Sequence, residues 1–245
     1  MCKSSIKPFK PSALRYFILL VSIAFSPAAY TESPHDEKPI HNNQTIAKNA
    51  KNAKSAEMAK QSMALHSETL QKLMLTLYQH NPKQLKKSTQ VSAEEMVQWT
   101  FEGPFGWKFD GVRRLQGIDA LKLASDESFP GDRVLVLIAG LQTMLAKAYG
   151  GKTEYDFSGE IDPQTLYNAA RNIEITSIKI NQLNDGIILS SSDKSAGLKP
   201  TDLTLELNQT ISRVDADAKR IAKQKKQVIQ LLDKHSEQAT QWQPQ

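Results

Sequence analysis

Apolar side chains recur at helical spacing over long stretches of this 245-residue chain. The first stretch covers residues 45–78, and the Asn81-Pro82 pair ends it because proline disfavours helix at the residue before it. In its second half four apolar residues share one face: Leu70, Leu73, Met74 and Leu77. The pattern predicts a long first helix that packs mainly through this half.

Residues 131–149 form the most apolar segment after the N-terminal region. The aliphatic run from Val134 to Leu141 is interrupted only by Gly140, and Gly150-Gly151 supplies a helix stop. We expect a central buried helix here. A strand over Val134–Ile138 remains the alternative, since periodicity alone does not separate the two for a short aliphatic run.

Two further helices are predicted in the second half of the chain. One begins with Asp162 as N-cap and Pro163 in the first turn, and it closes at Gly186. A Ser-rich loop over 187–200 follows, and the last helix is expected from Thr201 to about Gln238. Its apolar residues follow a heptad seam: Leu203, Leu207, Ile211, Val214, Ala218, Ile221, Val228 and Leu232.

These elements predict a mainly α protein, a helical bundle of about four principal helices with a long C-terminal helix. The bundle is expected within residues 44–240, and residues 241–245 form a short tail. Self-association through the two long helices is one expected property of such a fold.

The segment 99–109 concentrates aromatic residues. A Ser92-x-x-Glu95 capping box predicts a short helix toward Trp99, and alternation around Gly103-Pro104 then favours a hairpin or an ordered loop. These rings either plug the end of the bundle or form a binding site for a sugar, a peptide or a lipid interface. The candidate binding residues are Trp99, Phe101, Phe105, Trp107 and Phe109.

The first 28 residues have the pattern of a secretory signal peptide. A basic region without acids precedes the apolar run Tyr16–Phe25, and small residues at Ser26 and Ala28 suit cleavage after Ala28. The run is too short for an ordinary membrane span. We therefore expect a periplasmic or secreted protein with a flexible linker over residues 29–43.

Loss of this leader changes the charge and the available chemistry. The full chain has 31 basic residues, and four of them belong to the leader. Without the leader 27 basic and 26 acidic residues remain, so overall basicity gives no reason to expect nucleic-acid binding. The single cysteine, Cys2, leaves with the leader, which removes disulfides and thiol chemistry. We find no phosphate loop, serine elbow or zinc-protease motif and expect no cofactor and no metal site.

A second candidate site is a cationic run on the last helix, with no acid among residues 218–232. It is either a solvated helix face or a contact for anionic lipid. Its members are Lys219, Arg220, Lys223, Lys225 and Lys226.

The leading hypothesis is an exported, non-catalytic envelope protein that binds a partner, an envelope protein or glycan, or acts as a scaffold. One alternative is an enzyme acting on an envelope polymer, with aromatic residues holding the sugar and acids at 126, 127, 156 and 160 in catalysis. The other is a peripheral protein that binds anionic membrane surfaces.

Overall fold

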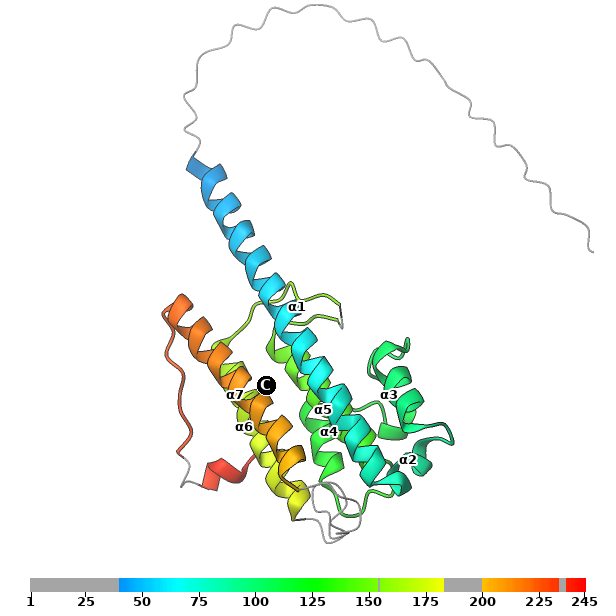
Figure 1. The fold of residues 1–245 in the computed structure, drawn as a ribbon. Helices are drawn as coiled ribbons and strands as arrows, with labels where there is room; N and C mark the ends of the chain where they lie inside the picture. Colours follow the sequence, from blue (N-terminus) through cyan, green and yellow to red (C-terminus); the bar gives the residue numbers. More distant parts are fainter. Residues whose placement is uncertain (1–39, 154, 183–199, 234–236) are drawn as a thin grey trace, which may run out of the picture. The chain divides into compact units, whose positions relative to one another are not determined.

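Helices account for nearly all the regular structure of the chain. The computed structural model describes residues 40–153, 155–182, 200–233 and 237–245, which belong to one unit. The predicted signal peptide, most of the linker and the Ser-rich loop lie outside the described residues. The described part contains seven α-helices, two short 3-10 helices and no strand, so the mainly α fold class is confirmed (Figure 1).

The helices follow one another with short connections. Their bounds are α1 Ile40–His80, α2 Pro82–Ser88, α3 Ala93–Glu102, η1 Asp110–Val112, α4 Gly117–Ala124, α5 Arg133–Ala148, α6 Pro163–Asn181, α7 Pro200–Lys225 and η2 Glu237–Thr240. The four longest helices, α1, α5, α6 and α7, are the four that the sequence predicts. The short helices α2 and α4 were not expected.

Helix α5 is the centre of the bundle. Its residues 133–141 are all buried, and it contacts α1, α4 and α6. The strand alternative over Val134–Ile138 is therefore wrong. At Gly140 a Cβ atom would lie 2.7 Å from Leu121 Cδ2, so glycine lets α4 approach α5 closely.

Helix α1 contributes to the core only from its middle onward. It starts at Ile40, inside the segment expected as a linker. Residues 45–54 are exposed and this end extends beyond the other helices, whereas Ala59, Met63 and the predicted stripe from Leu70 to Leu77 are buried (Figure 1).

Helix α7 is shorter than predicted. Its seam from Leu207 to Ile221 is buried, but the helix ends at Lys225 rather than near Gln238. Lys226 has a left-handed backbone with φ 55°, and residues 227–233 are not helical. The last described residues turn back past α6, so 241–245 are docked on the bundle and are not a free tail (Figure 1).

Candidate ligand-binding groove

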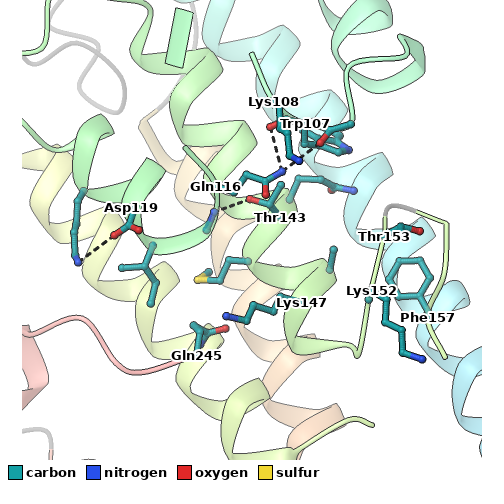
Figure 2. Close-up of a pocket in the computed structure, with 18 residues that line it drawn as sticks. Trp107, Lys108, Gln116, Asp119, Thr143, Lys147, Lys152, Thr153, Phe157 and Gln245 are labelled. Carbon is teal, nitrogen blue, oxygen red and sulfur yellow. Dashed lines mark hydrogen bonds and ion pairs between the residues drawn. The ribbon is translucent and has the colours of Figure 1, made fainter. Parts of the chain in front are cut away.

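A groove of about 810 Å³ opens beside the turn that follows α3 (Figure 2). This volume is typical of a small-molecule site. Its walls come from residues 106–108, the first turns of α4, the second half of α5, the loop 151–157 and Gln245.

The backbone around the groove is held by side-chain hydrogen bonds. The Gly117 amide donates to Thr143 Oγ1 over 2.7 Å, which fixes the start of α4 against α5. Gln116 Nε2 donates to the carbonyls of Gly106 at 3.2 Å and Trp107 at 3.4 Å. Gly106 and Trp107 both have positive φ, so this amide helps to stabilise a turn that Trp107 adopts at a cost.

Four exposed lysines line the groove: Lys108, Lys122, Lys147 and Lys152. Asp119 is the one acid among the described residues that line the groove. Its Oδ1 lies 3.4 Å from Lys122 Nζ, and this exposed ion pair contributes little stability. The other three lysines take part in no ion pair within the described structure. The groove therefore carries a local positive field suited to an anionic ligand.

Two glutamines of the groove lining each have a side-chain oxygen that receives no hydrogen bond. Gln142 donates through Nε2 to Ser67 Oγ over 2.7 Å, and Gln245 donates through Nε2 to the Thr165 carbonyl over 3.3 Å. The Oε1 atom of each glutamine is buried and receives no hydrogen bond. Because these oxygens are buried, the exposed polar side chains of the lining, such as Gln116 and Thr153, are the ones that a ligand can reach.

The aromatic segment divides into a packed group and an exposed pair. Trp107 is buried and makes edge contacts with Phe101 at 5.0 Å and with Phe109 at 6.1 Å between ring centroids. Trp99 and Phe105 are 49% and 47% exposed. Trp99 and Phe101 lie in α3, so they are in a helix rather than in the expected hairpin or loop.

Only one of these five aromatic residues, Trp107, lines the groove. The sequence did not predict the groove lysines, since they are spread over residues 108–152 and come together only through packing.

The cationic run on α7 is partly engaged in ion pairs. Arg220 Nη2 lies 2.6 Å from Asp217 Oδ1, and Lys225 Nζ lies 2.6 Å from Glu160 Oε1. Lys219, Lys223 and Lys226 are exposed. The run therefore does not present five unpaired cations.

The acids considered for catalysis hold local contacts. Asp126 accepts from Ser128, and Asp156 accepts from Ser158; these bonds lower the pKa of both carboxyls. The hydrogen bond and charge of Lys225 lower the pKa of Glu160. Glu127 is exposed, and the side-chain hydrogen bonds of the other three acids are to Ser128, Ser158 and Lys225.

A buried polar cluster joins α1, the end of α5 and α7. Tyr149 Oη donates to Asp217 Oδ2 over 2.7 Å, and Ser62 Oγ donates to the same oxygen over 3.0 Å. His66 Nε2 lies 3.2 Å from Tyr149 Oη, whose hydrogen already points to Asp217, so His66 donates. This leaves His66 Nδ1 as a bare acceptor, and that buried atom has no partner.

Burial sets the titration of this cluster. It lowers the pKa of His66 to about 4. The negative charge of Asp217 acts to raise this pKa, but its effect is smaller. Burial raises the pKa of Tyr149. Burial also acts to raise the pKa of Asp217, but hydrogen bonds from Arg220, Tyr149 and Ser62 outweigh it and hold that pKa below its usual value. The cluster is a neutral histidine beside a charged carboxylate.

A second cluster fixes the start of α5. The buried Asp132 caps the helix by accepting from the amides of Val134 and Leu135. It also accepts hydrogen bonds from the hydroxyls of Tyr78 and Ser88, each with a length of 2.7 Å. Burial raises the pKa of Asp132 despite these bonds. The sequence did not predict this side-chain contact between α1, α2 and α5.

No three His, Cys, Asp or Glu side chains gather as a metal site in the described part of the chain. None of the helices within the described ranges is long and apolar enough to span a bilayer. No family model, curated protein or solved structure matches the chain.

Proposed function

We propose that the protein is an exported, non-catalytic binding protein of the cell envelope whose groove holds an acidic glycan. The observation that carries the proposal is the gathering of Lys108, Lys122, Lys147 and Lys152 around one groove that contains a single described acid. Ammonium groups bind carboxylates and phosphates, and walls of low dielectric constant strengthen their field.

The exposed polar side chains of the lining favour a glycan among anionic ligands. Gln116 and Thr153 are exposed in the same lining, and the hydroxyl groups of a sugar form hydrogen bonds with such side chains. An acidic sugar therefore binds the lysines and these polar side chains together, whereas a bare inorganic anion binds only the lysines.

Export is the second part of the proposal, and it rests on the signal-peptide pattern of residues 1–28. Fusing this segment to a reporter enzyme that is active only outside the cytoplasm tests it. Reporter activity is expected, and inactivity of the fused reporter would contradict export.

The binding test uses a fluorescein-labelled oligomer of glucuronic acid and anisotropy. The wild-type chain is expected to bind it, and K147E/K152E should weaken binding at least about tenfold because two attractive charges become repulsive. The matched control K219E/K223E reverses two exposed charges on α7 and should change binding less than about twofold.

Equal losses in the two double variants would mean that overall charge, not the groove, binds the probe. Preference for a labelled oligoglutamate peptide over the sugar would overturn the glycan assignment. Either result, or no binding by the wild-type chain, contradicts the proposal.

A further inference from the structure

One end of the bundle brings together α1, the start of α6 and the end of α7. Ser62 of α1 donates to Asp217 of α7 over 3.0 Å, and the two helices run in opposite directions (Figure 1). Lys54 and Lys225 are each eight positions from this bond, so both lie about 12 Å from it on the same side. Lys225 Nζ donates to the Ile161 carbonyl over 2.7 Å, which brings the start of α6 to the same level.

This end of the bundle carries exposed lysines that α1 and α7 both contribute. They take part in no ion pair within the described structure. Residues 40–56 and 218–232 contain no acid, and Glu160, which also lies here, is paired with Lys225. The surface therefore has an excess of positive charge. We call it the cationic end, and its lysines are Lys51, Lys54, Lys223 and Lys226.

Large aliphatic side chains are exposed beside these lysines. Val228 and Leu231, in the chain that leaves α7, are 91% and 71% exposed. Ile46 is 58% exposed on the part of α1 that extends beyond the other helices (Figure 1). Exposed apolar side chains that are grouped with polar neighbours are typical of a contact surface.

The exposure of Val228 and Leu231 follows from how their segment is held. Gln164 of α6 accepts from the Gln230 amide over 2.7 Å and donates to the Gln230 carbonyl over 3.2 Å. Ile229 and Leu232 pack against the core. Because these contacts fix the backbone, the two exposed side chains are presented to the surroundings at a defined place beside the lysines.

We propose that the cationic end binds an anionic membrane surface. Lysines are attracted to anionic headgroups, and aliphatic side chains enter the boundary between headgroups and acyl chains. An acidic protein or polymer would satisfy the lysines but would give Val228 and Leu231 no apolar surroundings. None of these residues lines the groove, so this surface is independent of the proposed glycan site.

The test uses the chain from residue 29 onward, which keeps every described helix, and measures its co-sedimentation with lipid vesicles. Phosphatidylcholine vesicles with about 30% phosphatidylglycerol are expected to bind at least about tenfold more protein than pure phosphatidylcholine vesicles. Salt at about 1 M should release most of the bound protein, because it screens the lysines.

The charges are tested with K54E/K226E, which reverses one charge on α1 and one at the end of α7. This variant should bind the anionic vesicles at least about fivefold more weakly. The matched control K83E/K86E reverses two exposed charges on α2, which follows the other end of α1. It should change binding less than about twofold.

The aliphatic side chains are tested with V228S/L231S, which leaves the charge unchanged and should weaken binding at least about threefold. The control L65S/L205S replaces two exposed leucines away from the cationic end and should have little effect. A polarity-sensitive dye on V228C should shift to shorter wavelength with the anionic vesicles, whereas the same dye on L205C should not.

Three results would overturn the proposal. The first is no preference for anionic vesicles over pure phosphatidylcholine. The second is an equal loss of binding in K54E/K226E and K83E/K86E, which would show that overall charge alone is responsible. The third is vesicle binding that V228S/L231S leaves unchanged, which would assign the lysines to an acidic protein or polymer instead of a membrane.

Discussion

His66 lies where α1, α5 and α7 meet, and it has to stay neutral there. Burial lowers its pKa to about 4, while an unfolded histidine has a pKa near 6.5. The unfolded state therefore binds a proton more tightly between these values. The native state loses stability as the pH falls through this window.

We expect the free energy of unfolding of the wild-type chain to fall by about 2 kcal/mol more than that of H66Q between pH 6.5 and 4.5. Glutamine keeps a donor for Tyr149 but has no titration in this range. Urea unfolding followed by circular dichroism at several pH values measures the difference. Parallel pH profiles would contradict the assignment of a buried neutral histidine.

Asp132 is the other residue on which several elements depend. Its carboxylate caps α5 and accepts bonds from Tyr78 of α1 and Ser88 of α2. D132A should lower the free energy of unfolding by about 2–4 kcal/mol, since it removes the cap and leaves the buried Tyr78 hydroxyl without an acceptor. D132N, which keeps one acceptor oxygen, should lose less. Equal stability of D132A and the wild-type chain in urea would show that this contact is unimportant.

These contacts between polar side chains could not be predicted from the sequence, for a physical reason. His66 and Tyr149 are 83 positions apart, and Tyr78 and Asp132 are 54 apart. Helical periodicity marks which face of a helix is buried, but it does not tell which polar side chains meet inside. The capping box at Ser92 and Glu95 was predictable because its two hydrogen bonds are local, and the structure contains both.

At the scale of helices, close approach depends on Gly140. A Cβ atom there would meet the Leu121 side chain and lie 3.1 Å from the Gly117 carbonyl, which borders the groove. G140A should therefore lower the free energy of unfolding by about 1–3 kcal/mol, although alanine favours helix. Thermal unfolding of the variant and the wild-type chain measures this loss of stability.

Gly111 provides a matched control, because a Cβ atom there meets nothing within 4 Å. G111A should be close to neutral. Similar losses in both variants would mean that the α4–α5 contact is loose enough to accept a methyl group.

The four long helices were predictable because each carries an apolar stripe, but the end of α7 was not. The apolar pattern continues past Lys225, so periodicity alone extended the helix toward Gln238. In the structure the backbone hydrogen bonds to Gln164 and Asn172 hold that chain in an extended form instead. Tertiary contacts thus override a local pattern that still favours helix.

At the scale of the whole molecule, the groove is the main candidate for function. Its lysines come from the turn after α3, from α4, from α5 and from the loop after it, so only the folded bundle brings them together. The sequence drew attention to the neighbouring aromatic segment instead, of which Trp107 alone reaches the groove.

Photo-crosslinking in the native envelope tests the central proposal most directly. A photoreactive phenylalanine analogue replaces Lys108 at the groove in one variant and Lys219 on α7 in a control variant, and products are identified by mass spectrometry. The account predicts adducts that carry an acidic glycan from position 108 and none from position 219. Adducts from position 108 only to the protein's own helices would contradict it.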